Sequence, residues 1–156
     1  MLHIYTDGAC SGNGKENANG GFGVYMTNDK DNDFSELYSE YCENTTNNRE
    51  ELKSIYHAIK YIDKNKESAI IYSDSAYCIN TITQWALGWK NRGWVKADKK
   101  TPENLDLIKP IFQLYQDNSF NIEFRKVKGH SGVEGNEIAD ALASNNQAKL
   151  SKLINK

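Results

Sequence analysis

The hydrophobic pattern of the chain changes period near residue 46. Before that point, three segments are predicted to be strands: Leu2–Thr6, which alternates apolar and polar residues, Gly21–Thr27 and Glu36–Glu43. The dipeptide Asp7-Gly8 is predicted to end the first strand, and the glycine- and asparagine-rich residues 8–21 are predicted to form a loop. Three successive strands with short connections indicate an antiparallel meander.

After residue 46 the apolar residues follow a helical period. A helix is predicted to begin near Thr46-Asn47-Asn48, where capping residues gather, and its apolar face carries Leu52, Ile55, Ile59 and Ile62. Residues 69–73 form a short apolar run, as a buried central strand would. Helices are predicted over 75–85 and 102–115, a fifth strand over 122–127, and a last helix from 134 into the tail.

This order, β-β-β-α-β-α-α-β-α, predicts an α/β fold. Three antiparallel strands followed by two parallel ones would form a five-stranded mixed sheet flanked by helices. At 156 residues, the chain is expected to form a single domain over residues 1–156. No apolar run approaches the ~20 residues of a membrane span, so we expect no membrane contact. No predicted helix has an apolar face left over for binding a protein partner, so we expect a monomer.

The cysteines and the charges restrict the setting. Cys10, Cys42 and Cys78 are odd in number and match no zinc spacing, which favours a reducing, cytoplasmic environment. The net charge of −2 conceals a basic segment between Lys90 and Lys100, which holds five basic residues and one acid. A basic patch on an acidic body suits a protein that grips phosphate in one place and holds metal ions in another.

Two acids are predicted to follow strands. Asp7 follows the first strand and Asp74 the fourth, so parallel pairing of these strands would bring both side chains to the sheet edge where open α/β folds bind ligands. Each acid also has a purely structural explanation. Asp7-Gly8 could form a turn, and Asp74 or Ser75 could cap the next helix.

Two further acids lie in predicted helices, Glu51 near the start of one and Asp140 in the last. Either Glu50 or Glu51 could complete a capping box with Asn47 or Asn48, and Asp140 could be an exposed position. One glutamate suffices for the cap, however, and Asp140 has no lysine or arginine three or four residues away.

A cluster of these acids would need a cation, because like charges repel. Oxygen ligands without a Cys/His set favour Mg²⁺ or Mn²⁺ over zinc. Two such ions ~3.5–4 Å apart would activate a water molecule and stabilise an in-line phosphoryl displacement.

Five short motifs, in order along the chain, resemble those of the type 1 ribonucleases H. They are YTDGAC (5–10), TTNNREEL (45–52), YSDS (72–75), KGHSG (128–132) and NEIAD (136–140). The similarity runs from residue 4 to about 143, and it implies the ribonuclease H-like fold. Each motif alone is weak, but five in order above fitting secondary structure are specific.

The resemblance assigns a role to each matching position. The family's four metal-binding catalytic acids match Asp7, Glu51, Asp74 and Asp140. Glu51 is preferred to Glu50 because the family's glutamate directly precedes the leucine. His130, in a glycine-flanked loop, matches an auxiliary residue for proton transfer or product release.

The substrate-binding positions follow in the same way. The residues that contact the minor groove and the 2′-hydroxyl groups of RNA match Asn13, Asn47 and Asn48. A pocket for a DNA-strand phosphate matches Thr46 and Asn104. The family's basic protrusion matches Trp85, Trp89, Lys90, Arg92 and Lys96, together with Trp94. For each tryptophan, the structural alternative is a small satellite core.

The expected function is endonucleolytic hydrolysis of the RNA strand of RNA–DNA hybrids with two Mg²⁺ ions, or Mn²⁺, giving 5′-phosphate and 3′-hydroxyl ends. Departures from the family at Asn44, Ala76 and Lys96 bear on affinity for the hybrid and not on the acids. One alternative is a non-catalytic hybrid-binding module, although binding alone needs no repulsive carboxylate cluster. Another is a different nuclease of the superfamily, which would not usually combine TTNNR with a basic, tryptophan-rich protrusion.

Overall fold

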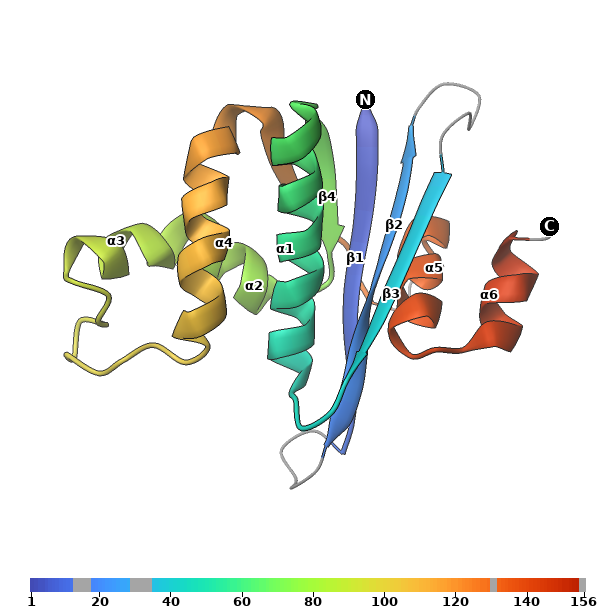
Figure 1. Ribbon diagram of the computed structural model, residues 1–156, viewed down its shortest axis with the longest axis horizontal. Helices are drawn as coiled ribbons and strands as arrows, with labels where there is room; N and C mark the ends of the chain where they lie inside the picture. The colour runs from blue at the N-terminus through green and yellow to red at the C-terminus, as the bar shows by residue number, and fades with distance from the viewer. Residues whose placement is uncertain (13–17, 29–34, 130–131, 155–156) are drawn as a thin grey trace.

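The computed structural model describes residues 1–12, 18–28, 35–129 and 132–154 (Figure 1). Five strands form one sheet in the order β3-β2-β1-β4-β5. The first three pair antiparallel, whereas β4 lies parallel to both β1 and β5. The predicted α/β fold with a mixed sheet is therefore confirmed. The strands are β1 (Leu2–Ser11), β2 (Asn19–Asn28), β3 (Ser35–Cys42), β4 (Ala69–Ser73) and β5 (Ile122–Lys126).

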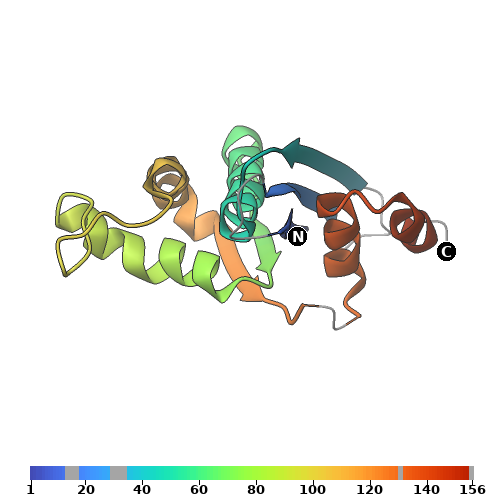
Figure 2. The same cartoon turned by 90° about the horizontal axis from the view of Figure 1, so that it is seen from below.

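Helices cover both faces of the sheet. Seen from below, α1 (Asn47–Asn65) and α4 (Leu105–Asn118) lie on one face and α5 (Glu134–Ala143) lies on the other, with α6 (Gln147–Ile154) outside it (Figure 2). A further helical stretch follows β4 as α2 (Ala76–Asn80), the π-helical η1 (Thr81–Trp85) and α3 (Ala86–Asn91). A 3₁₀ turn, η2 (Ser119–Asn121), leads into β5. Among the described residues, none of these helices is long and apolar enough to cross a bilayer.

The main core lies between α1 and the sheet. The apolar face predicted for α1 is fully buried and packs with residues of β1, β2, β4 and α4. Burial of this face fixes the rotation of α1 about its axis. The polar residues at its N-terminal end are thereby held at a fixed place against β1.

β1 does not end at Asp7-Gly8, which corrects the sequence prediction. Its antiparallel pairing with β2 runs on to Ser11, whereas its parallel pairing with β4 stops at Tyr5. Residues 8–11 and 19–21, predicted as loop, are therefore in strands. Gly8 serves a close approach of helix and strand, because a Cβ atom there would lie 2.4 Å from the backbone N of Glu51.

Three predicted helix boundaries also shift. The helix expected over 75–85 continues to Asn91 through the π-helical turn, and the helix expected from 102 begins at Leu105 because Asn104 is left-handed, with φ 61°. The predicted last helix is two helices, since Asn145 is left-handed, with φ 54°, between α5 and α6. Asparagine adopts this conformation more readily than most residues, and here it precedes one helix, at Asn104, and follows another, at Asn145.

Candidate active site

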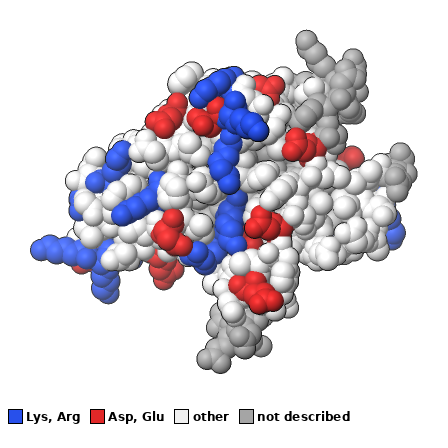
Figure 3. Space-filling model, in the orientation of Figure 1, with Lys and Arg blue, Asp and Glu red and all other residues white. Residues whose placement is uncertain are grey.

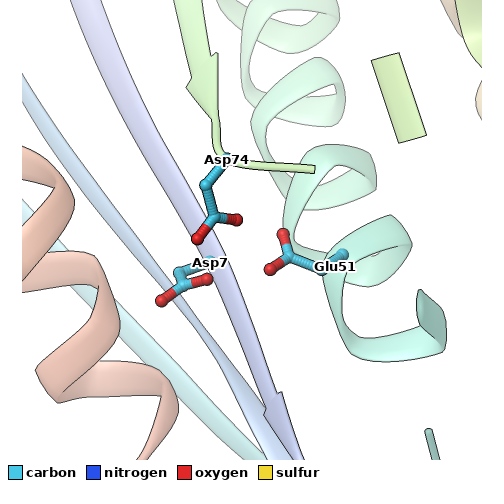
Figure 4. A group of neighbouring side chains, drawn as sticks. All are labelled: Asp7, Glu51 and Asp74. Atoms are coloured by element: carbon cyan, nitrogen blue, oxygen red, sulfur yellow. The ribbon is translucent and has the colours of Figure 1, made fainter. Parts of the chain in front are cut away.

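Three carboxylates meet where β4 ends beside β1. Asp7 lies on β1 just past the last residue paired with β4, Asp74 directly follows β4, and Glu51 comes from α1 across Gly8. Figure 4 shows the three side chains converging from these three elements. One carboxylate oxygen from each lies within 4.8 Å of those from the other two.

Neither Asp74 nor Glu51 is used as a helix cap. Ser75 caps α2, with its Oγ accepting a hydrogen bond from the backbone N of Cys78 at 3.1 Å. Thr46 caps α1 in the same way, accepting from the backbone N of Arg49 at 3.2 Å. The capping explanations considered for Asp74 and Glu51 are therefore wrong.

The two neighbouring glutamates of α1 point to different surroundings. Glu50 is fully buried away from the cluster, where its Oε2 accepts a hydrogen bond from Thr45 Oγ1 at 2.6 Å and pairs with Lys53 Nζ at 2.6 Å. Glu50 thus does not complete a capping box either. The structure brings Glu51, and not Glu50, to Asp7 and Asp74.

Asp140 reaches the same place from the opposite face of the sheet. It lines an open hollow of about 290 Å³ with the three other acids, Gly8, Asn47, Asn48 and Ser75. Ala139 is fully buried beside it, and a Cβ atom at Gly23 would lie 2.4 Å from the carbonyl O of Ala139. Small residues on both sides therefore let α5 approach β2 closely enough to bring Asp140 to the hollow.

Lys149 pairs with Asp140, a contact that the sequence analysis missed. Its Nζ lies 2.7 Å from Asp140 Oδ2 and 2.6 Å from Glu137 Oε2. No local signal could reveal this pairing, because Lys149 belongs to α6 and returns to α5 across the break at Asn145.

The electrostatics of the cluster favour a bound cation. Burial raises the pKa of Asp7 to about 7; a hydrogen bond with Glu51 opposes this shift, and the charges of Asp74 and Asp140 add to it. Burial, followed by the charge of Asp7, raises the pKa of Glu51 well above its ordinary value. Both carboxyl groups therefore resist ionisation unless positive charge is supplied.

The ligand atoms fit a hard divalent cation. The cluster offers only carboxylate oxygens, and Glu51 Oε2 is buried with no hydrogen-bond partner among the described residues. Magnesium and manganese prefer such oxygen ligands, whereas zinc and softer metals prefer nitrogen and sulfur. Asp7, Glu51 and Asp74 could hold such an ion, and Asp140 lines the same hollow.

Two predicted site residues, Asn13 and His130, lie outside the described residues. The segment that leads to the second of them passes against the cluster. A Cβ atom added at Gly129 would lie 2.9 Å from Asp74 Oδ2, so only glycine allows this approach without a shift. Gly129, the glycine of the KGH motif, therefore lies against Asp74.

The residues predicted for the DNA-strand phosphate lie where α1 and α4 begin. Thr46 caps α1, and Asn104 precedes α4, where its Oδ1 accepts from Arg49 Nη1 at 3.4 Å and its Nδ2 donates to Tyr77 OH at 3.2 Å. Arg49 also donates to both carboxylate oxygens of Asp106, at 3.0 and 2.8 Å. This fork joins the two helix ends. Arg49 belongs to the motif TTNNREEL, in which no role was predicted for it.

The predicted basic protrusion is formed by α3 and the loop after it. Figure 3 shows Lys and Arg side chains at the end of the molecule where Figure 1 places these segments. Trp85 is 42% exposed and lies 6.4 Å from Trp89, ring centre to ring centre. Of the predicted cations, Arg92 is exposed, Lys96 is half-buried, and Lys90 is exposed and donates to Gln116 Oε1 at 2.8 Å.

Trp94 packs against an aromatic residue of α4. It is half-buried and packs edge-on against Phe112 with ring centres 6.2 Å apart, and Lys109 Nζ lies 5.7 Å from its ring centre. Trp94, like Trp89, packs against the main core. Trp94 therefore joins the main core and not a small satellite core, and its part in substrate binding stays a prediction.

Comparison with known proteins agrees with this geometry. The family model "RNase H" matches residues 1–148. The chain is 38% identical to a ribonuclease H of Ruthia magnifica subsp. Calyptogena magnifica over 148 residues, covering 95% of this chain and 96% of the relative. Its fold is similar to the solution structure of the PFV RNase H domain, with a TM-score of 0.79, 25% identity and 91% of each chain covered. It is also similar to LC11-RNase H1 in complex with RNA/DNA hybrid, with a TM-score of 0.64, 23% identity, and 92% of this chain and 94% of that one covered. The chain therefore belongs to the RNase H family.

Proposed function

We propose that the protein is an endoribonuclease that hydrolyses the RNA strand of RNA–DNA hybrids, using two Mg²⁺ ions, or Mn²⁺, held by Asp7, Glu51, Asp74 and Asp140. The observation that carries the proposal is the hollow lined by these four acids and by Asn47 and Asn48 in a chain of the RNase H family. It joins candidate metal ligands to groups that can bind a sugar hydroxyl.

The bound ions would activate a water molecule and stabilise charge on the attacking and leaving oxygens. The carboxylates would hold the ions in fixed positions, because β1, α1, the end of β4 and α5 carry Asp7, Glu51, Asp74 and Asp140. In-line attack at phosphorus breaks the bond to the 3′ oxygen, so the products carry 5′-phosphate and 3′-hydroxyl ends. His130 would exchange the proton of the leaving group or of water, supported by the approach of Gly129 to Asp74.

The two strands of the hybrid would be recognised by different surfaces. Asn47 and Asn48, and with them Asn13, would bind 2′-hydroxyl groups in the minor groove, the feature that distinguishes RNA from DNA. Thr46 and Asn104 would bind a phosphate of the DNA strand, held in place by the Arg49–Asp106 fork.

The basic protrusion would hold the DNA strand beyond that phosphate. Its exposed aromatic face is Trp85, backed by Trp89, and its cations are Lys90, Arg92 and Lys96. Cations neutralise backbone phosphates and aromatic faces stack on sugars or bases. We further propose that the protein acts as a cytoplasmic monomer, consistent with its three free thiols.

Cleavage of labelled duplexes tests the proposal. Wild-type protein with Mg²⁺ is expected to cut the RNA of an RNA–DNA hybrid and to leave RNA and DNA duplexes intact, and Asp7→Asn is expected to cut none of them. Hybrid binding without Mg²⁺-dependent cleavage would identify a binding module instead. Cleavage of duplex DNA would identify another class of nuclease.

A further inference from the structure

A lysine of helix α6, Lys149, forms an ion pair with Asp140, one of the four site acids. Helix α6 runs back beside α5, outside the sheet (Figures 1 and 2). It brings Lys149 Nζ to 2.7 Å from Asp140 Oδ2 and 2.6 Å from Glu137 Oε2. The side chains of Lys149, Asp140 and Glu137 are 28%, 23% and 16% exposed. This arrangement is more enclosed than an ordinary surface ion pair.

The position of Lys149 is fixed by the turn between the two helices. Asn146 lies just before α6, and its Oδ1 accepts a hydrogen bond from the backbone N of Lys149 at 3.0 Å. Its own backbone N donates to the carbonyl O of Ala141 at 2.8 Å, which ties the turn to α5. The first turn of α6 is therefore anchored to the helix that carries Asp140, and Lys149 reaches the two acids from that anchored turn.

The ammonium group contacts a carboxylate that the proposed metal site uses. Asp140 lines the same hollow as Asp7, Glu51 and Asp74, and one of its two carboxylate oxygens already contacts Lys149. A lysine in contact with a carboxylate stabilises its negative charge, and the same positive charge repels a divalent ion approaching that carboxylate. The two cations therefore oppose each other at Asp140.

We propose that Lys149 is a built-in counter-cation of Asp140, which competes with the divalent ion there and lowers the affinity of the site for it. The inference rests on the proposed function, because it takes Asp140 as a metal ligand. The simpler alternative is that Lys149 only fastens α6 to α5. The two explanations predict opposite effects of removing the lysine. Loss of a competing charge tightens metal binding, whereas loss of a structural contact between α6 and α5 makes Asp140 more mobile and weakens metal binding.

Direct Mn²⁺ binding distinguishes them. Free Mn²⁺ is measured by electron paramagnetic resonance during titration of the full-length protein without nucleic acid. Lys149→Met keeps the aliphatic stem and removes the charge, and it is expected to bind Mn²⁺ about 3–10-fold more tightly than wild type, as removal of one partly screened charge contact allows. Lys149→Arg keeps the charge and is expected to stay within about 2-fold of wild type. Lys152→Met, which removes an exposed charge from the same helix, is the matched control and is also expected to stay within about 2-fold.

Hybrid cleavage provides a second measurement on the same variants. The Mg²⁺ concentration for half-maximal cleavage by Lys149→Met is expected to fall by the factor found with Mn²⁺. Circular dichroism in EDTA checks that each variant is folded, and if Lys149→Met does not fold, Lys149→Gln takes its place.

Unchanged or weaker Mn²⁺ binding by the charge-removing variant would overturn the inference. An equal gain in Mn²⁺ affinity in Lys152→Met would also overturn the inference, because the gain would then come from the change in net charge and not from loss of the contact with Asp140. The variant Asp7→Asn distinguishes this result from failure of the proposed function. If Asp7→Asn binds Mn²⁺ as tightly as wild type does, the proposed metal site is wrong.

Discussion

A carboxylate oxygen of Asp7 lies within 4.8 Å of one from Asp74 because β4 ends at Ser73 while β1 continues beside it. The unequal lengths of the two parallel strands open a gap at the sheet, and both acids border it. The backbone of Asp7 is fixed by pairing of β1 with β2, and Asp74 directly follows Ser73, the last residue of β4 that pairs with β5. A substitution at either position should therefore change the chemistry of the site and leave its frame intact.

Asp7→Asn is expected to lower hybrid cleavage by roughly 10³-fold, since a neutral amide is a poor ligand for a divalent ion. The same change should raise the free energy of unfolding by about 1–3 kcal/mol at pH 8 in EDTA, because it removes a buried charge beside other carboxylates. Urea unfolding measures this gain, with Asp117→Asn, on an exposed part of α4, as the control. A less stable Asp7→Asn protein would show that the carboxylates do not repel one another.

Glu50 and Glu51 provide an internal comparison. Glu51→Gln is expected to lower cleavage by roughly 10³-fold with little loss of stability. Glu50→Gln is expected to keep cleavage within a few-fold but to cost about 1–3 kcal/mol of stability, because it weakens the buried contacts with Thr45 and Lys53. Steady-state cleavage and urea unfolding of both variants test the assignment, which fails if the two sets of effects are exchanged.

The sequence predicted the elements well because period and caps are local signals. The face of α1 that begins at Leu52, the start of this helix near Thr46 and the strand at 69–73 all follow from neighbours within a few residues. The choice of Glu51 over Glu50 needed the family motif, because the helical pattern alone allows either residue near the first turn.

Other features depended on contacts between distant segments. Asp7-Gly8 is compatible with a turn, and only the packing of α1 on β1 shows that Gly8 makes room for a helix within a strand. The pairing of Lys149 with Asp140 crosses a helix break, so no helical spacing predicts it. Such errors concern the boundaries of helices and strands and the contacts between distant segments, which local sequence patterns do not encode.

Gly23→Ala is expected to destabilise the protein by about 1–3 kcal/mol, the usual cost of overpacking. The added methyl group would lie 2.4 Å from the carbonyl O of Ala139 and 2.7 Å from the backbone N of Ala143, so α5 must move away. Asp140 moves with that helix, and Mn²⁺ binding should weaken as well. In Gly88→Ala the new methyl group makes only ordinary contacts, with the guanidinium group of Arg92 just after α3, and the change is expected to leave Mn²⁺ binding unaltered. Thermal unfolding and Mn²⁺ titration of the two variants make the comparison.

His57 should make stability depend on pH away from the site. Its ring stacks on Tyr38 with centres 3.9 Å apart, and burial, with a smaller effect of Lys60, lowers its pKa below 6.5. The unfolded chain therefore takes up the proton first as the pH falls, so the folded state loses stability below about pH 6.5. The loss is expected to be less than about 1 kcal/mol for this half-buried ring.

His57→Phe keeps an aromatic ring and removes this proton. The difference in unfolding free energy between the variant and wild type should therefore shift in favour of the variant between pH 7.5 and pH 5.5, as measured by urea unfolding in EDTA. A difference that is constant over this range would contradict the prediction.

Trp85 and Trp94 should separate nucleic-acid binding from folding. Trp94→Ala removes a ring packed on Phe112 and the main core, and is expected to cost about 3 kcal/mol of stability. Trp85→Ala removes an exposed ring, and is expected to weaken hybrid binding by roughly 10-fold with less than about 1 kcal/mol of stability lost, since stacking is worth about 1–3 kcal/mol per contact. Fluorescence anisotropy of a labelled hybrid in EDTA and urea unfolding measure the two effects separately. Equal hybrid affinity of Trp85→Ala and wild type would mean that the exposed ring does not contact the DNA strand, and the protrusion would then act through its cations alone.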